Sequence, residues 1–412
     1  MASTSTAPSA LHDRNLFFHL MGVGAWFLSV GLQFVLVPTA AVVVLGLGAL
    51  ELGVAQLAVF LPNLLLLLLG GVLADKRDGR LWLLQWHGVA MLPPLWIIFK
   101  FWTGQFQYYD LILYALAMGA TTAFVMPTRD AMLGRVAAAD LQRGVLLVLF
   151  VQFATQIGGY MLAGGLALGA PVWSLALAQL ACLGAGAAAL IAMRPLPPQP
   201  GAAPSSPGAA PSSQWQDLLE GWRAVWRSPR LYPVMLAMSA VGLFFIGAFL
   251  VMLPMMAATK FGGGQLEISL TSLCFWGGTM VTTIVLMLRP PIARRGRAMC
   301  CSLGFGTLIL ASTSAAPNFA SLCALCTLWG MNAGVTMVMS RTVVQTKAPE
   351  KLRARVLALY SLSFMGGAPA GALGMGVIID LVGLDWSPFL PAAGMLVFLL
   401  WLMRTSSLWR LR

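Results

Sequence analysis

Ionisable residues inside long apolar segments are the first candidates for chemistry, because a charge at the centre of a bilayer costs several kcal/mol. The chain has 13 acidic residues, and nearly all of them fall in polar segments or at the ends of apolar ones. The exception is Asp130, which follows Arg129 near the end of an apolar segment. If protons drive this protein, Arg129 would hold the carboxylate ionised until a substrate competes, so the two residues form a candidate coupling pair. A structural ion pair at a helix end is the alternative.

Other reactive groups are scattered along the chain. Three histidines without an acidic cluster do not supply the converging nucleophile, base and metal ligands of an enzyme. His87 lies in an apolar segment, where it could titrate, although a packed or interfacial histidine is the simpler interpretation. The six cysteines fall in or beside apolar segments, and a pair such as Cys323 and Cys326 more often packs than binds metal. The sequence therefore predicts neither an enzyme nor a metal or cofactor site.

Polar and aromatic side chains on apolar segments form a third group, which could contact a solute in a central cavity. Gln152 and Gln156 are the strongest pair, because residues four apart share one face of a helix. The whole candidate set is Trp26, Gln33, Asn63, Gln152, Gln156, Trp276 and Asn332. Each of these is equally compatible with a hydrogen bond between helices. Met252, Met255 and Met256 surround Pro254, which indicates either an adaptable apolar wall or the packed face of a kinked helix.

The elements that would position these residues are membrane-spanning helices. Hydrophobic residues make up 59% of the chain and charged residues 9%, whereas roughly a quarter of the residues in a soluble domain are charged. The apolar segments approach or exceed the ~20 residues that cross ~30 Å of hydrocarbon. The sequence predicts an all-α membrane protein with twelve helices near 16–40, 48–70, 82–102, 110–132, 143–166, 172–193, 231–256, 265–288, 298–316, 318–342, 353–379 and 386–404.

The basic residues predict the orientation of these helices. With twelve helices, every Lys and Arg residue except Lys100 and Lys260 falls on the same side as the N-terminus. Membrane proteins concentrate such residues on the cytoplasmic side. We therefore expect both termini in the cytoplasm and a multi-pass location in a bacterial inner membrane. The net charge of +12 then reflects topology, which excludes a nucleic-acid partner and leaves an attraction to anionic lipid head groups.

A segment rich in Pro, Gly, Ala and Ser divides the chain near its middle. It opens with PLPPQPGAAPSSPGAAPSS, a composition typical of a flexible linker. Trp215, Trp222 and Trp226 follow at helical spacing opposite charged residues, which indicates an amphipathic helix in the membrane interface, with partner docking as the alternative. The expected organisation is a tail at 1–15, a six-helix bundle at 16–194, a linker at 195–230, a second six-helix bundle at 231–404 and a basic tail at 405–412.

The most informative string is GGVLADKRDGR, from Gly70 to Arg80, between the second and third helices. Its glycines let helices approach closely, and an Asp there can bond helix-end amides and pair with a cation. The string resembles the loop motif of the major facilitator superfamily, which is Gly-x-Leu-Ala-Asp followed by a basic cluster. The resemblance implies two pseudo-symmetric bundles and a conformational latch between them. The latch residues would be Gly71, Asp75, Lys76, Arg77 and Arg80.

Further segments carry the resemblance along the chain. The segment from Met126 to Val145 is similar to the segment from Met339 to Val356, and the Arg in the second copy adds Arg341 to the coupling candidates. The extra residue in the loop motif, together with LLEGWRAVWRSPRLYP and VQTKAPEKLRARVLALYSL, resembles the enterobactin exporter branch and its macrolide-efflux relatives.

Three departures from the family pattern limit what the resemblance implies. The second-half counterpart of the loop motif, RPPIARRGR, lacks the Asp, so the latch is expected to be asymmetric. Tyr160 stands where antiporters often carry Pro. Ala115 stands where drug antiporters carry an Arg, so the proton-relay role of that Arg is not carried over.

The resemblance implies a secondary active exporter that works by alternating access, in antiport with protons. The expected solute is a small polar or amphipathic metabolite, with a siderophore as the first expectation and a macrolide or another drug as the second. A cavity without a fixed central charge suits a neutral or zwitterionic solute. A non-transporting membrane receptor is the alternative of another class. The expected partners are the solute, protons and membrane lipids, and the chain is expected to act as a monomer.

Overall fold

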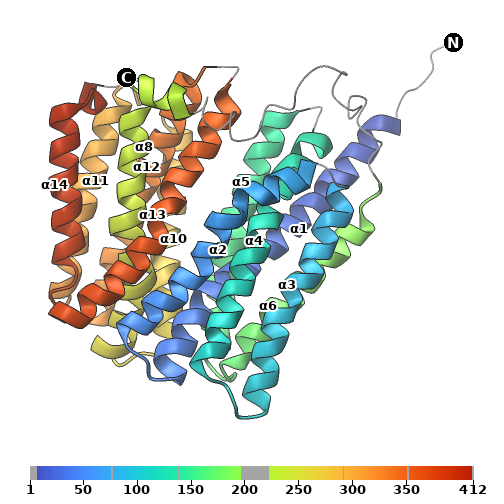
Figure 1. The fold of residues 1–412 in the computed structure, drawn as a ribbon, viewed down its shortest axis with the longest axis horizontal. Helices are drawn as coiled ribbons and strands as arrows, with labels where there is room; N and C mark the ends of the chain where they lie inside the picture. Colours follow the sequence, from blue (N-terminus) through green and yellow to red (C-terminus); the bar gives the residue numbers. More distant parts are fainter. Residues whose placement is uncertain are drawn as a thin grey trace.

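The structure is a computed structural model in which two groups of helices stand side by side (Figure 1). It describes residues 7–75, 78–137, 140–195, 222–290, 292–349 and 352–410. The N-terminal half begins with a long helix that ends in a π-helical segment. Its elements are α1 (Ala7–Pro38), η1 (Thr39–Val44), α2 (Ala49–Asp75), α3 (Gly79–Trp102), α4 (Tyr108–Val136), α5 (Leu141–Leu166) and α6 (Trp173–Ala192).

The C-terminal half begins with a span in which α and π turns alternate. This span consists of α8 (Tyr232–Ala240), η2 (Val241–Ile246), η3 (Ala248–Met252), α9 (Leu253–Met255) and η4 (Met256–Lys260). The remaining elements are α10 (Gln265–Leu288), α11 (Arg295–Ser312), η5 (Thr313–Ala315), α12 (Phe319–Lys347), α13 (Arg353–Val382), α14 (Phe389–Thr405) and η7 (Leu408–Arg410).

The predicted all-helical membrane fold is confirmed. Eleven stretches of helix in the described residues are long and apolar enough to cross a membrane, and α14 is a shorter apolar helix. Each of the twelve predicted ranges overlaps one of these, and the described residues contain no β-strand. The main difference lies in the Tyr232–Lys260 span, where the sequence predicts an ordinary helix and the structure has π turns with i→i+5 hydrogen bonds.

Acidic and amide side chains explain where several helices begin. The Asp78 carboxylate accepts hydrogen bonds from the backbone amides of Arg80 (2.9 Å) and Leu81 (3.3 Å) at the start of α3. Asp110 accepts the amide of Gln107 at the start of α4 (3.0 Å), and Asn318 accepts that of Ser321 at the start of α12 (2.9 Å). These caps satisfy amides that have no partner inside the helix.

Glycines bring equivalent helices together in the two halves. In the N-terminal half α1 packs on α5, where a Cβ atom on Gly31 would lie 3.0 Å from the Cα atom of Gly159. In the C-terminal half the Tyr232–Lys260 span packs on α13, where a Cβ atom on Gly367 would lie 2.7 Å from the backbone nitrogen of Leu243. Gly70 and Gly119 join α2 to α4, and Gly278 and Gly330 join α10 to α12, in the same way. Small residues permit such approaches in membranes, and the repeated pairing supports duplicated halves.

The bundle has two distinct ends. We call the end where α2 stops and α3 begins, at residues 75–79, the motif end, and the other end the opposite end. Because consecutive spans run in alternate directions, α1 starts and α14 stops at the motif end, and Figure 1 shows both termini there. Lys100 and Lys260, the two cations that the charge pattern separates from the rest, lie at the opposite end.

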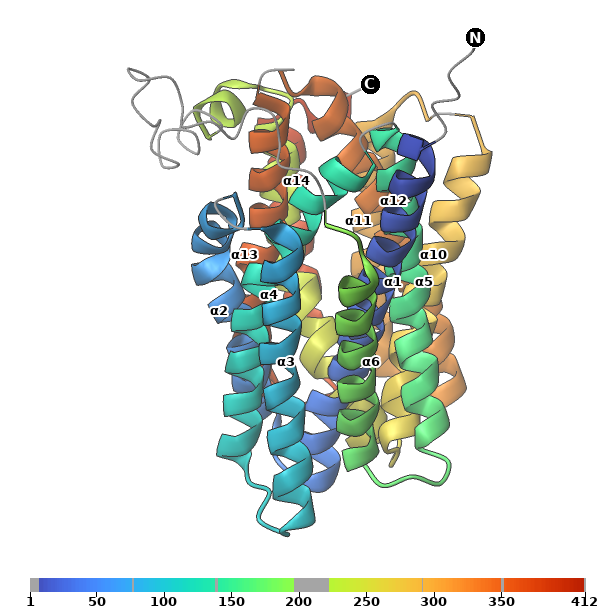
Figure 2. The same ribbon diagram turned by 90° about the vertical axis from the view of Figure 1, so that its right-hand side faces the viewer.

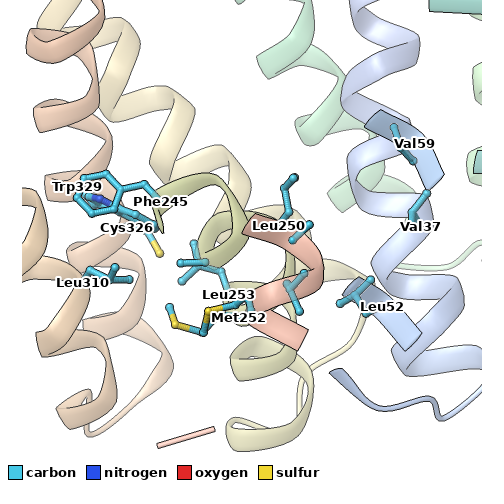
Figure 3. Close-up of a cluster of buried hydrophobic side chains, with 14 of the residues drawn as sticks. Val37, Leu52, Val59, Phe245, Leu250, Met252, Leu253, Leu310, Cys326 and Trp329 are labelled. Carbon is cyan, nitrogen blue, oxygen red and sulfur yellow. The ribbon is translucent and has the colours of Figure 1, made fainter. Parts of the chain in front are cut away.

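The buried side chains form two clusters. One extends across both halves, from Val37 and Leu52 in the N-terminal half to Leu253, Leu310 and Trp329 in the C-terminal half (Figure 3). The other lies only in the N-terminal half, toward the motif end, and includes Val23, Leu83, Val125 and Leu190. The halves therefore share a core near the opposite end, and the N-terminal half has a separate core near the motif end.

The predicted linker lies largely outside the described residues. Residues 222–227 are helical, and the Trp222 and Trp226 rings are stacked with their centroids 5.5 Å apart. Both rings are exposed while Val225 is buried. This arrangement fits the last turns of the predicted interfacial helix. Trp215 is not among the described residues, and the domain boundaries stay predictions.

Candidate functional site

The two halves contact each other near the opposite end. The first turns of α2 pack against the last turns of α13, where a Cβ atom on Gly53 would lie 2.8 Å from the Ala372 carbonyl oxygen. A Cβ atom on Gly376 would lie 2.6 Å from the Ala49 carbonyl oxygen. The last turns of α5 pack against the first turns of α10 at Gly164. Between α2 and α13 the contact is so close that backbone meets backbone, whereas Gly164 meets side chains of α10.

Two glutamine side chains join the halves at the same end. Gln56 of α2 donates from Nε2 to the carbonyl oxygen of Leu250 in η3 (3.4 Å). Gln265 of α10 donates from Nε2 to the carbonyl oxygen of Ala163 in α5 (2.8 Å). Both amides are buried, so each bond is worth about 1 kcal/mol against an unpaired group. The sequence analysis missed both residues, although an amide near the start of each equivalent helix was a signal that could have found them.

Toward the motif end the ribbons of the two halves diverge (Figure 1). Figure 2 looks onto the N-terminal half, with α3 and α6 in front. The rings of Phe153 on α5 and Trp276 on α10 make a contact across the two halves, with their centroids 5.9 Å apart. Both residues stand about midway along their helices. The halves therefore meet from the opposite end down to the middle of the bundle.

An aromatic and amide cluster occupies this middle level. Phe153 faces Trp276, and Trp276 also contacts the ring of Phe249 from the first C-terminal span, at 6.4 Å between centroids. Next to them the Gln156 Nε2 atom donates to the hydroxyl of the fully buried Tyr160 (3.0 Å). The buried Trp276 indole N–H interacts with the Tyr160 hydroxyl, without the alignment of a regular hydrogen bond. We call Phe153, Gln156, Tyr160, Phe249 and Trp276 the midlevel cluster.

The predicted solute-contacting residues fall into two sets. Gln156 and Trp276 belong to the midlevel cluster, and the half-buried Gln152 lies one turn from Gln156 on α5. Trp26 lies instead inside the N-terminal half, with its ring 5.3 Å from that of His87 and almost fully buried. Asn332 donates to Leu328 of its own helix (2.9 Å). Gln33 is buried in α1, and Asn63 is buried in α2 with an unpaired side-chain oxygen.

The predicted methionine wall is part of the packed core. Met252, Met255 and Met256 are at most 7% exposed and belong to the cluster that spans both halves. Figure 3 shows Met252 beside Leu253 among the buried side chains. The alternative of a packed face of the helix therefore describes these three residues.

Arg129 and Asp130 form an ion pair, with Nη2 and Oδ1 2.7 Å apart. The Arg129 side chain is 12% exposed and the Asp130 side chain 63%, and the guanidinium carbon lies 5.2 Å from the centre of the Phe27 ring. The cation is thus held inside the bundle and the carboxylate at its surface. Arg341, the predicted counterpart, is exposed near the end of α12.

The loop motif is described only in part. Lys76 and Arg77 and the side chain of Asp75 lie outside the described residues. Arg80 donates from Nε to the Leu190 carbonyl (2.8 Å) and from Nη2 to the Ile191 carbonyl (2.7 Å), which caps the last turn of α6 within the same half. A Cβ atom on Gly71 would meet nothing within 4 Å, so the close helix approach expected of both motif glycines occurs at Gly70 alone.

No cluster of metal ligands is present in the described part of the chain. Groups of three or more His, Cys, Asp or Glu side chains that could hold a metal ion are absent there. The six cysteines are free thiols. What the geometry provides is a set of hydrogen-bonding and aromatic groups between two bundles.

The fold and this site define a polytopic membrane protein built as a two-bundle transporter. The family model of the Major Facilitator Superfamily matches residues 20–372. The chain belongs to the Major Facilitator Superfamily. No curated protein matches the sequence.

Solved structures of transporters share this fold. The nucleoside transporter NupG has a TM-score of 0.69 and 11% identity over 96% of this chain and 98% of its own. A bacterial homologue of the human lysosomal transporter Spinster, in an inward-facing and unoccupied conformation, has a TM-score of 0.65 and 11% identity over 97% and 96%. A POT family transporter in complex with 5-aminolevulinic acid has a TM-score of 0.70 and 11% identity over 95% and 96%. At this identity the likeness shows the fold alone.

Proposed function

We propose that the chain is a secondary active exporter that moves a small amphipathic solute by alternating access. The observation that carries this proposal is the position of the contacts between the halves, which run from the opposite end to the midlevel cluster while the halves diverge at the motif end. Contact between the halves at one end and divergence at the other is the arrangement expected of an alternating-access transporter that is open on one side. The pairing of α2 with α13 and of α5 with α10 would open when the solute leaves toward the opposite end.

The charge pattern supports a cytoplasmic motif end, because every Lys and Arg residue except Lys100 and Lys260 belongs to that side of the topology. Both exceptions carry a local carboxylate partner: Lys100 lies 3.6 Å from Asp110 and Lys260 lies 2.6 Å from Asp385. The opposite end is then periplasmic in a bacterial inner membrane. With this orientation the contacts between the halves would close the periplasmic side, and we propose an inward-facing state.

The midlevel cluster supports a neutral or zwitterionic solute with aromatic or amide character. It offers the Trp276 N–H beside the Tyr160 hydroxyl, the Gln156 amide and the faces of three aromatic rings, and no fixed charge. A siderophore fits these groups, and the loop and linker segments resemble the enterobactin exporter branch. A macrolide is the alternative substrate within the same mechanism. We propose protons as the coupling ion, with Arg129 and Asp130 near the motif end.

The test is transport by the purified full-length protein in proteoliposomes with an imposed pH gradient. The solute panel contains a catecholate and a hydroxamate siderophore, a macrolide, a nucleoside and 5-aminolevulinic acid. We expect siderophore movement that depends on the gradient. Movement of the macrolide alone would replace the substrate proposal, and no movement of any solute would favour a non-transporting receptor. In cells, a deletion strain that secretes siderophore normally under iron limitation would remove the siderophore.

Two variants connect transport to the midlevel cluster. Trp276→Phe keeps a ring and removes the N–H, so we expect the KM for the solute to rise about five- to tenfold, the equivalent of one hydrogen bond. Asn332→Ala is the matched control, because its amide bonds to its own helix outside the cluster. A KM that rises equally in both variants would place the solute elsewhere.

A further inference from the structure

A small polar pocket lies inside the N-terminal half, apart from the contact between the halves. His19 and Trp26 of α1, His87 of α3 and Arg129 of α4 line it, and Leu190 of α6 closes it. These residues stand on four different helices near the motif end. The volume open to a water-sized sphere is about 10 Å³, which is close to what a single water molecule needs.

Four buried polar atoms around this pocket have no hydrogen-bond partner among the described residues. They are Nε2 of His19, Nε1 of Trp26, Nε2 of His87 and Nη1 of Arg129. The histidine and tryptophan side chains are at most 3% exposed. A buried polar atom without a partner costs about 1–3 kcal/mol, so four of them on residues that line one cavity favour a bound species there.

The hydrogen-bonding roles of these atoms fit one water molecule. Nδ1 of His87 lies 2.8 Å from the Leu83 carbonyl oxygen, which can only accept, so Nδ1 carries the proton and Nε2 of the neutral ring is an acceptor. Trp26 and Arg129 can only donate. A water molecule that accepts from these two donors, donates to His87, and donates to His19 when that ring carries its proton on Nδ1 would use both of its lone pairs and both of its hydrogens.

The backbone of α6 makes room for the His87 ring. A Cβ atom on Gly186 would lie 2.9 Å from Cδ2 and 3.0 Å from Nε2 of His87. The edge of the ring that carries the free nitrogen is therefore fixed against a glycine. Trp26 holds the ring from the α1 side with an edge-to-face contact at 5.3 Å.

The charge beside the histidines comes from Arg129. Two of its nitrogens bond Asp130, with Nε at 2.9 Å and Nη2 at 2.7 Å, while Nη1 is left for the pocket. Apart from His12 and Asp13, whose side chains lie outside the description, the other charged or titratable groups on the surrounding helices do not line the pocket. They are Arg14 on α1, Arg80 and Lys100 on α3, Tyr108, Tyr109, Asp110, Tyr114, Asp130 and Arg135 on α4, and Cys182 on α6. An imidazolium here would be buried next to a guanidinium, which disfavours a second positive charge.

We propose that this pocket is a proton-binding site in which the proton and the Arg129 guanidinium are alternative occupants. Hydronium from the aqueous phase gives a proton to Nε2 of His87 and leaves as water, and the neutral imidazole becomes imidazolium. The new N–H donates to the bound water through the lone pair that Arg129 gives up, and the water turns one hydrogen away from His87 while the other stays on His19. The guanidinium withdraws from the like charge toward Asp130 and the surface. The role of this exchange in transport rests on the proposed function, whereas proton binding itself does not.

The test is a pH titration of the full-length protein in nanodiscs by nitrogen NMR with labelled histidine. The chain has three histidines, so a His12→Gln background leaves only His19 and His87. We expect both rings to stay neutral in the parent protein at neutral pH, with His87 protonated at Nδ1. In Arg129→Gln the titration midpoint of His87 should move upward by at least about one pH unit, or tenfold in proton affinity.

Arg341→Gln is the matched control, because Arg341 is the exposed counterpart in the other half. The titration midpoint of His87 in this variant should equal that in the parent protein. Arg129→Leu removes the charge without burying an amide and must give the same upward shift if Arg129→Gln does not fold. An unchanged midpoint in the folded Arg129 variant would overturn the proposal, and so would an equal shift in Arg341→Gln.

Transport separates this proposal from the proposed function. In proteoliposomes His87→Gln should abolish the dependence on the pH gradient while solute exchange without a gradient continues. If the NMR shift is absent and transport is normal, the proton site is wrong and the exporter stands. If the NMR shift is present and no solute moves, the exporter is wrong and the proton site stands.

Discussion

The two halves share their helix pairing but differ in where they place polar groups. In the N-terminal half Arg129 lies inside the bundle with His19 and His87 around one pocket. In the C-terminal half the counterpart Arg341 is exposed, and the neighbouring Ser340 forms a 2.8 Å hydrogen bond with Tyr360. In the described residues, the duplicated framework therefore places the buried guanidinium and the two buried histidines in the N-terminal half.

The largest difference between the halves is expected for the ion pairs at the opposite end. Asp110 is fully buried and also accepts from Trp96 (3.0 Å), whereas the Asp385 side chain is 71% exposed. Asp110→Asn should lower the free energy of unfolding by about 3 kcal/mol, because it leaves Lys100 uncompensated. Asp385→Asn should cost less than about 1 kcal/mol. Unfolding in mixed micelles measures both, and equal losses would break the comparison.

The contact between the halves is the next test. Gly376→Val would push against the Ala49 carbonyl, and we expect it to disfavour the closed opposite end by about 2–3 kcal/mol. Gly374→Val is the matched control on the same helix, because a Cβ atom there meets nothing within 4 Å. Spin-label distances across α2 and α13 should lengthen in the first variant only. If they lengthen in neither, the closed end does not depend on this glycine.

The packing around the polar pocket can be tested within α6. Gly186→Ala should destabilise the protein by about 1–2 kcal/mol, because the new methyl group meets the His87 ring, which has no room to shift. In Gly184→Ala the methyl group would lie 3.5 Å from the flexible end of Met91, so we expect little change. Thermal unfolding of the two variants gives the difference, and a smaller loss in Gly186→Ala than in Gly184→Ala would contradict a fixed histidine ring.

The smallest effect is expected for the glutamines that join the halves. Gln265→Leu removes the bond to Ala163, and Gln56→Leu removes the longer bond to Leu250. Each substitution should shift the equilibrium between the closed and the open state of the opposite end by about 1 kcal/mol or less, which is roughly fivefold in population. The shorter bond predicts the larger shift for Gln265→Leu. Spin-label distances at the opposite end give the populations of the two states in each variant. A larger shift in Gln56→Leu would show that the Gln56 bond is the stronger of the two.

The sequence predicts the helices well because length and apolarity alone decide them. The twelve predicted ranges follow from the bilayer thickness, and the split into halves follows from the linker and from the repeat that contains Arg129 and Arg341. The sequence also identifies the Arg129 and Asp130 pair, although it favours the carboxylate as the residue inside the apolar segment and the structure buries the guanidinium instead. These features depend on composition along the chain, which a single sequence reports directly.

It is harder to predict from the sequence which face of each helix packs against which neighbour. A helix that is apolar on every face gives no periodic signal about its direction, so Trp26 and Asn332 were placed with Trp276 although their partners are His87 and Leu328. The cross-half bonds of Gln56 and Gln265 end on backbone carbonyls, which leave no mark in the sequence. The polar pocket needs four helices to converge, and no local spacing predicts that.

The π turns between Val241 and Lys260 have a consequence for how the first C-terminal span can move. A π turn holds one more residue than an α turn. If the π turn shifts along the helix, each residue that it passes rotates about the helix axis by about 100°. Phe249 of the midlevel cluster lies within η3. This span can thus exchange the side chain that it offers to Trp276 by a change of hydrogen-bond register, with both of its ends left in place.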